Sequence, residues 1–151
     1  MIKKLAGAFV AAGALLVFGA PAAQAAPPEP FTITENLDFE AEEFTFTATG
    51  GLCPSGTFQD DVRAVGAGNA PIPKVNLLIR TVYACDSGDT FLAQKHVFIA
   101  ANEDGSSTST GPITLKGGTG AFTELSGHGV NNGTAAEGIG VGEISGVLQL
   151  S

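Results

Sequence analysis

Apolar and polar residues alternate along much of the chain from residue 31 onward, and a period of two is typical of strands with one buried face. The first such segment, 31–39, has an apolar residue at every second position except one, where Glu35 stands. The alternation returns at 44–48, after an acidic group, and more weakly at 58–65, after a glycine pair. No later segment shows a sustained helical period, so the pattern predicts strands and turns.

The second half of the chain continues this pattern. Segment 75–84 has the clearest alternation, and 90–101 follows it across a turn. Apolar side chains lie on both faces of 90–101, so the sequence leaves open whether the face with Lys95 or the face with His96 points inward. Further strands are expected at 113–115, 125–130 and 139–150.

Glycine-containing turns separate these segments. Gly117-Gly118-Thr119-Gly120 is expected to bend the chain sharply, because glycine accepts positive φ and allows backbones to approach closely. Asn131-Asn132-Gly133 is a typical signal for a two-residue hairpin turn. About eight strands joined by short turns predict an all-β fold, a closed antiparallel β-barrel, with a β-sandwich as the alternative. The glycine content of the second half favours the barrel, because closure needs strong bends.

The first 25 residues have the pattern of a signal peptide. Lys3 and Lys4 precede an apolar stretch at 5–18, and Ala23-Gln24-Ala25 offers a cleavage site between small residues. The apolar run is shorter than the roughly 20 residues that a membrane-spanning helix needs. We therefore expect a secreted, extracellular protein with three parts: a signal peptide (1–25), a proline-rich leader (26–30) and one barrel domain (31–151).

Charge excludes two classes of partner. Without Lys3 and Lys4, five basic residues remain against fifteen acidic ones. Nucleic acids and anionic membrane surfaces both require clustered basic residues, so we expect no nucleic-acid partner and no membrane association after signal cleavage. The chain has one tyrosine, Tyr83, and no tryptophan, which argues against binding of bases or sugar faces by stacking.

Cys53 and Cys85 are the only cysteines, and in an exported chain they predict one disulfide. Each is followed by a glycine-containing turn and then by a Thr-Phe pair. Equivalent positions on successive hairpins would place both at the same end of a barrel, within the roughly 5–6 Å between Cα atoms that a disulfide needs.

Metal and cofactor sites have little support. His96 and His128 are the only histidines, and their spacing matches no zinc motif, so we expect no metal centre and no cofactor. Asp86 and Asp89 could contribute oxygen ligands to calcium, but a plain hairpin turn explains them better.

Catalytic motifs are also lacking. Ser126 and Ser145 do not stand in the G-x-S-x-G form of a nucleophile elbow. The pairs Glu42-Glu43 and Asp60-Asp61 are poor acid–base pairs, because adjacent residues of a strand point to opposite faces. We assign no catalytic residue, and the sequence favours a protein that is not an enzyme.

A resemblance rests on the glycine-rich segment. Gly117-Gly118-Thr119-Gly120-Ala121-Phe122, followed by Gly127-His128-Gly129, resembles the glycine motif of the allene oxide cyclase and dirigent barrel superfamily. The segments 53–58 and 111–114 also resemble small secreted bacterial proteins of unassigned activity. The superfamily resemblance implies an eight-stranded barrel, often trimeric. It further implies that the motif shapes the barrel without being its reaction centre; the residues concerned are Gly117, Gly118, Thr119, Gly120, Phe122, Gly127 and Gly129.

Two functions from different classes follow. The first is a non-catalytic secreted barrel with an interaction role outside the cell or at its envelope. The second, which the resemblance implies, is a barrel that binds a hydrophobic small molecule or guides its cyclisation. A cavity of roughly a few hundred Å³ with two or three converging polar side chains would favour the second. The many phenylalanines predict instead a barrel filled by its own side chains.

Overall fold

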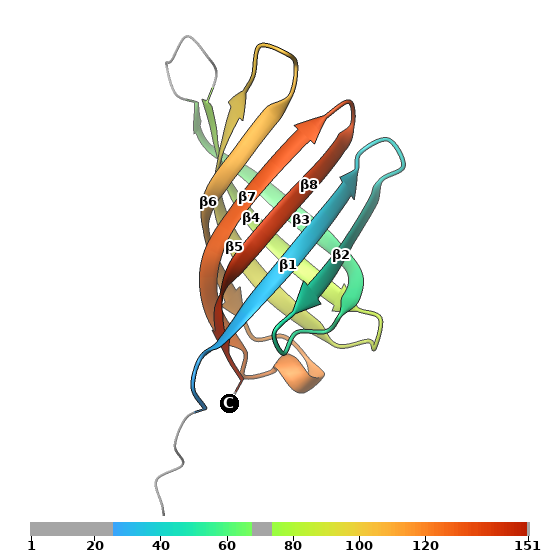
Figure 1. The fold of residues 1–151 in the computed structure, drawn as a ribbon, viewed down its shortest axis with the longest axis vertical. Helices are drawn as coiled ribbons and strands as arrows, with labels where there is room; N and C mark the ends of the chain where they lie inside the picture. The colour runs from blue at the N-terminus through green and yellow to red at the C-terminus, as the bar shows by residue number, and fades with distance from the viewer. Residues whose placement is uncertain (1–25, 68–73, 151) are drawn as a thin grey trace, which may run out of the picture.

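The computed structural model describes residues 26–67 and 74–150, and the chain folds into a closed barrel of eight antiparallel strands (Figure 1). Each strand pairs with its neighbours in the chain, and β1 pairs with β8. The predicted barrel is therefore confirmed, and the sandwich alternative is wrong because closure leaves one continuous sheet. The elements are β1 (Glu29–Asp38), β2 (Glu43–Thr49), β3 (Ser55–Ala67), β4 (Lys74–Cys85), β5 (Thr90–Ala101), β6 (Ser107–Lys116), the 3₁₀ turn η1 (Gly120–Phe122), β7 (Ser126–Ala136) and β8 (Ile139–Gln149).

The expected signal peptide, 1–25, lies outside the described residues. The expected leader, 26–30, is shorter than predicted, because β1 already begins at Glu29 and pairs there with Leu148 of β8. No helix in 26–67 or 74–150 has the length and apolar character to cross a membrane.

One turn prediction is wrong. Asn131-Asn132-Gly133 does not turn, because β7 runs through it and pairs with β6 and β8 on both sides. The hairpin turn falls later, at Glu137 and Gly138, and both have the positive φ that such a turn needs. The local preference of Asn-Asn-Gly is overridden because two neighbouring strands satisfy its backbone hydrogen bonds.

The barrel has a filled half near one end. Inward side chains from all sides meet there, and the Tyr83 ring stacks on Phe91 at 4.5 Å between centroids. This half lies toward η1 and the C-terminal end of β8 (Figure 1). The core consists of Phe31, Ile33, Phe46, Leu52, Phe58, Tyr83, Phe91, Ala93, Ile113, Leu115, Phe122, Leu125, Ile144 and Leu148, together with Cys53 and Cys85.

The structure shows which face of β5 points into the barrel. Residues Phe91, Ala93, Lys95 and Val97 are buried and point inward, while the intervening Gln94, His96 and Phe98 are exposed. Lys95 therefore belongs to the barrel interior although it is charged.

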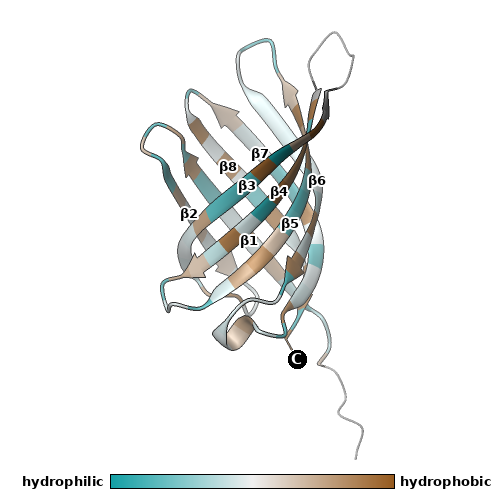
Figure 2. Cartoon of the chain, turned by 180° about the vertical axis from the view of Figure 1, so that it is seen from behind, coloured by the Kyte–Doolittle hydropathy of each residue, from teal (hydrophilic) through white to brown (hydrophobic). Residues whose placement is uncertain are grey.

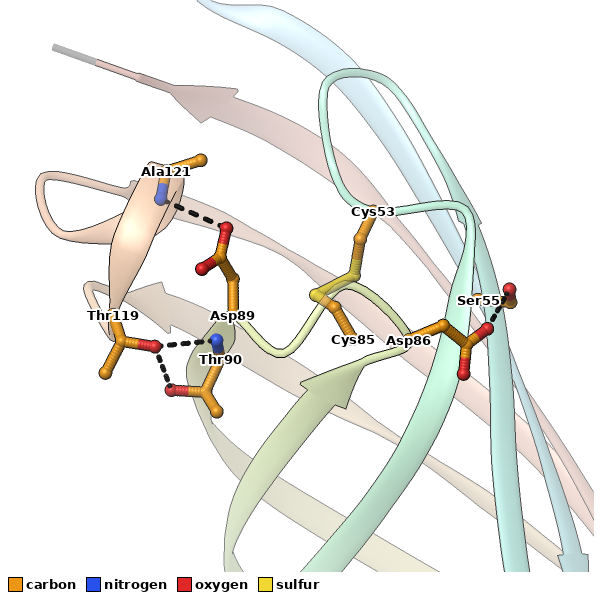
Figure 3. The surroundings of a disulfide bond; sticks show 8 residues. All are labelled: Cys53, Ser55, Cys85, Asp86, Asp89, Thr90, Thr119 and Ala121. Carbon is orange, nitrogen blue, oxygen red and sulfur yellow. Dashed lines mark hydrogen bonds between the residues drawn. A yellow bond between two sulfur atoms is a disulfide. The ribbon is translucent and has the colours of Figure 1, made fainter.

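The filled end is closed by three connections that bond to one another (Figure 3). Cys53, between β2 and β3, is joined by a disulfide to Cys85 at the end of β4, with 5.9 Å between the Cα atoms. Asp89 accepts a hydrogen bond from the backbone of Ala121 in η1, and Thr119 bonds to Thr90. The predicted disulfide is thus present and lies at one end of the barrel, although Cys53 follows β2 by several residues and does not end it.

The barrel wall is incomplete at the other end. β2 and β3 pair at three positions only: Thr45 with Thr57, Phe46 with Gly56 and Thr47 with Ser55. Beyond these positions the two strands diverge, as both ribbon views show (Figures 1 and 2). Val62 of β3, which follows Phe58 on the inward face, is consequently 50% exposed.

We expect reduction of the Cys53–Cys85 disulfide to lower the free energy of unfolding by about 3–4 kcal/mol. The bridge spans 32 residues, and the loss of its loop-closure constraint on the unfolded chain gives this magnitude. Denaturant titration with and without reductant measures the change. Two alkylatable thiols in the purified, unreduced protein would contradict the assignment.

The glycine motif gives a second stability test. Gly120 has φ 57°, but Gly118 has no positive φ; a Cβ there would lie 2.0 Å from the Thr90 carbonyl oxygen. Gly118→Ala should therefore push η1 away from β5 and lower the free energy of unfolding by about 2 kcal/mol or more. Gly88→Ala is the control, because Gly88 has positive φ with no atom within 4 Å, and it should lose only about 1 kcal/mol. Equal losses in the two variants would contradict the close-approach argument.

Candidate functional site

A carboxylate lies buried at the middle of the barrel. Glu35, an inward residue of β1, is 4% exposed, and its Oε1 accepts hydrogen bonds from the Tyr83 hydroxyl and from Nζ of Lys95. Both donors are also buried, at 0% and 2% exposed. The Glu35–Lys95 ion pair is therefore held away from water, where the loss of hydration must be balanced by hydrogen bonds of good geometry.

Strand register brings these groups together. β1, β4 and β5 each present the residue concerned at an inward position, so the three side chains reach toward the barrel axis. Gly142, the neighbour of Glu35 on β8, leaves the necessary room. A Cβ at Gly142 would lie 3.0 Å from the second carboxylate oxygen, Oε2. That oxygen therefore faces a position from which a side chain is missing.

Aromatic rings and a second carboxylate complete the electrostatics. Nζ of Lys95 lies 5.5 Å from the centroid of the Phe58 ring and 5.7 Å from that of Tyr83, within the range of cation–π attraction. Asp60 accepts a hydrogen bond from the Thr81 hydroxyl at 2.5 Å. Burial, followed by the negative charges of Glu35 and Asp60 and the hydrogen bond to Glu35, raises the pKa of Tyr83 well above its usual range.

A cavity of about 130 Å³ lies on the open side of this polar cluster. Glu35, Lys95 and Asn131 line it together with apolar groups such as Leu37 and Val97. Asn131 is 5% exposed, and its side-chain amide forms no hydrogen bond with another residue of 26–67 or 74–150. Every fully buried side-chain nitrogen or oxygen in the described part of the chain has a hydrogen-bond partner. Because the Asn131 amide has none, it must retain some contact with solvent. Asn131 therefore presents free hydrogen-bonding capacity to the cavity.

The cavity exists because inward residues become small toward the open end. Along β8 the inward residues are Leu148, Gly146 and Ile144 in the closed half, and only Gly142 and Gly140 toward the open end. β6 changes in the same way, from Leu115 and Ile113 to small residues, Gly111, Ser109 and Ser107. Because these inward side chains are small, the closed half is packed and the open half leaves a cavity. The expectation of a barrel filled throughout is wrong for this reason.

The mouth of the cavity combines an aromatic ring with acidic turns. Phe39 lines the cavity, is 52% exposed and contacts Phe44 edge-on. The described turns and strand ends around it carry seven carboxylates: Asp38, Glu40, Glu42, Glu43, Glu103, Asp104 and Glu137. The mouth therefore has a negative potential that repels anions.

A larger hollow, of about 650 Å³, lies on the outer surface across β5 to β8. Phe98, Thr110 and Val141 are among its lining residues, and Glu143 is its only charged side chain. It contains no cluster of buried polar groups. The interior cavity is therefore the better candidate, because polar groups converge on it within an apolar wall.

Residues singled out from the sequence lie elsewhere. His96 is exposed and bonds outward to Asn76 at 2.6 Å between Nε2 and Oδ1, and His128 is exposed on β7. Asp86 bonds to Ser55, whereas Asp89 bonds to η1, so the two carboxylates serve different connections (Figure 3). Ser126 and Ser145 are exposed strand residues.

The glycine motif also lies apart from the cavity. Its first part, with Gly117, Gly118, Thr119, Gly120 and Phe122, forms the closed end of the barrel around η1. Gly127 and Gly129 follow in β7, and a Cβ at Gly129 would lie 2.3 Å from the Ser145 carbonyl oxygen. These positions allow close approach of backbones, and none of them lines the interior cavity.

We assigned no site role from the sequence to the four polar residues of this cluster: Glu35, Lys95 and Asn131, which line the cavity, and Tyr83, which reaches Glu35 from the packed core. A signal for two of them is nonetheless present. Glu35 and Lys95 stand at positions whose neighbours two residues away are apolar, as a charged residue on an inward face would. Opposite charges at two such positions are a pattern that predicts a buried pair.

We expect the tyrosinate absorbance of the native protein to remain absent as pH rises past about 10, and to appear together with unfolding. In the unfolded chain Tyr83 loses its proton near pH 10, whereas the folded protein retains it. The contribution of Tyr83 to the free energy of unfolding is therefore fully present below about pH 10 and decreases as the pH rises above it. Tyr83 is the only tyrosine, which makes the signal unambiguous. Tyr83→Phe is the control and should show a weaker loss of stability. Reversible ionisation of Tyr83 near pH 10 without unfolding would contradict the assignment.

A double-mutant cycle tests the buried ion pair. Glu35→Gln and Lys95→Met should each lower the free energy of unfolding by about 3 kcal/mol or more, because each leaves one buried charge without its partner. The double variant should lose clearly less than the sum of the two, because no uncompensated charge remains. Denaturant titration of the four proteins gives the coupling. Additive losses would mean that the two charges do not interact.

Searches against protein-family models, curated proteins and solved structures find no match to this chain.

Proposed function

We propose that the chain is a secreted binding protein whose open barrel half takes up a small, mostly apolar molecule that carries one uncharged polar group. Secretion is supported by the signal-peptide pattern of 1–25 and by the Cys53–Cys85 disulfide, which suits an oxidising compartment. Uptake is supported by the cavity. The observation that carries the proposal is Asn131, a buried amide with free hydrogen-bonding capacity on a mostly apolar cavity wall whose charged groups, Glu35 and Lys95, are paired with each other.

The size and chemistry of the cavity restrict the ligand. The volume of about 130 Å³ is below the few hundred Å³ expected for a typical small-molecule site. It is close to the roughly 150 Å³ of an engineered cavity that binds benzene, so one ring or a short branched chain fits. Leu37, Val97 and Ile99 supply apolar contact, and Asn131 offers both a donor and an acceptor. Larger ligands would extend past Phe39 into the mouth.

The arrangement favours binding over turnover. General acid–base catalysis needs a group that takes a proton from the substrate and usually a second group that returns one. Oε1 of Glu35 accepts from Tyr83 and Lys95, and only Oε2 faces the empty position beside Gly142. Lys95 already neutralises the charge of Glu35, and the described lining contains no second carboxyl or imidazole group to act with it. The pair thus anchors the floor of the cavity, and Asn131 is left to orient the ligand. This is the binding role that the resemblance to the allene oxide cyclase and dirigent superfamily implies, without its cyclisation step.

Benzyl alcohol is a suitable first probe, because its ring fits the cavity and its hydroxyl can reach an amide. We expect saturable binding in ligand-observed NMR, and loss of binding in Ala135→Phe, which would fill the cavity from β7. Ala136→Phe is the matched control, since the adjacent residue is exposed and does not line the cavity. Equal binding to both variants would place the probe outside the cavity and overturn the proposal.

The ligand's charge gives a second prediction. Benzoate has a similar size but is anionic, and the seven carboxylates around the mouth should exclude it. We expect benzoate to bind at least tenfold more weakly than benzyl alcohol at low salt, and the difference to narrow as salt is added. Benzoate binding equal to that of the alcohol at low salt would contradict the role given to the acidic mouth.

A further inference from the structure

One edge of β3 has no strand beside it. β3 pairs with β4 along its length, but its other edge pairs with β2 only between Ser55 and Thr57. From Phe58 to Ala64 that edge faces no other strand among the described residues. Unpaired N–H and C=O groups along a strand edge form a template for a further strand.

We infer that two copies of this chain associate through this edge, with β3 pairing antiparallel to β3 of the second copy about a two-fold axis at Val62. The pairing would join the two barrels into one sheet across β4, β3 and their counterparts. It would also cover Val62, an apolar side chain that is 50% exposed because β2 is absent there. The inference stands independently of ligand binding.

Strand geometry and charge select this register among the alternatives. Residues directly opposite in an antiparallel pair lie on the same face of the sheet, so an odd-numbered residue of β3 must face an odd-numbered one of its copy. A two-fold axis at Asp61 would oppose two aspartates, and an axis at Arg63 would oppose two arginines. An axis at Val62 places Asp61 of each copy opposite Arg63 of the other. Of the three axes, only this one creates attractive pairs.

The surrounding charges support the same register. Arg63 and Arg80 are the only arginines of an acidic chain, and both lie on the outer face next to this edge. Asp61 stands directly opposite Arg80 of β4 in the strand register of its own barrel. In the dimer, each Asp61 would lie between Arg80 of its own barrel and Arg63 of the second copy. All three side chains are exposed in the single chain and available for this contact.

The edge is regular over the length that the pairing uses. The β3–β4 ladder is uninterrupted up to Ala64, and the bulge falls between Ala64 and Gly66. Five residues of each strand, 60–64, therefore pair without distortion. The bulge turns the strand beyond them, which limits further addition and favours a closed dimer over an open fibre.

A charge-swap series tests the inference. Asp61→Arg and Arg63→Asp should each yield monomers in sedimentation velocity, because each places like charges opposite each other at both contacts. The double variant, with the two charges exchanged, should dimerise again. An equimolar mixture of the two single variants should form heterodimers, in which every opposing pair is attractive. A double variant that stays monomeric, or a wild-type chain that is monomeric or trimeric throughout, would overturn the inference.

Cross-linking tests the register directly. Val62→Cys should form a disulfide-linked dimer on mild oxidation, because the two-fold axis sets residue 62 opposite itself at about 4.5–5.5 Å between Cα atoms. Gln59→Cys is the control: it is exposed on the same strand but lies far from its own copy in this register. Cross-linking of both variants at equal rates would indicate random collision and overturn the inference, as would binding of an unrelated extended peptide at this edge without self-association.

Discussion

The buried ion pair between Glu35 and Lys95 divides the interior of the barrel into two halves. On its closed side, aromatic and aliphatic side chains fill the space, and their packing supplies the stability that a charge pair removed from water does not. On its open side, glycine, alanine and serine leave a cavity. The pair can lie at this boundary because groups of the packed side interact with both charges. The Tyr83 hydroxyl donates a hydrogen bond to Glu35, and the Phe58 and Tyr83 rings lie near the Lys95 ammonium group.

If the proposed binding function holds, stability and binding depend on opposite ends of one fold. The disulfide, η1 and the core close one end and fix the strand register there. Register fixed at one end of a barrel is transmitted along every strand, since a slip of one residue would move each inward side chain outward. The open end therefore keeps Glu35, Lys95 and Asn131 in place although few side chains pack around them.

Much of the fold was predictable because it depends on short-range pattern. Alternation in 31–39 and 75–84 located β1 and β4, and the cysteines indicated which connections meet. The site was less accessible, since Glu35 and Tyr83 are 48 residues apart and meet only through closure of the barrel. Asn131 was missed for a related reason: Asn-Asn-Gly has a strong local turn preference, and only the pairing of β7 with both neighbours makes the first asparagine an inward residue.

The incomplete wall between β2 and β3 bears on both proposals. In the single chain, the divergence of these strands leaves Val62 of β3 half exposed. In the inferred dimer, the second copy's β3 would cover this gap in the wall. The axial mouth beside Phe39, ringed by carboxylates, would then be the main path into the cavity. Association would thereby direct ligands through the end of the barrel that, in the proposed function, selects against negative charge.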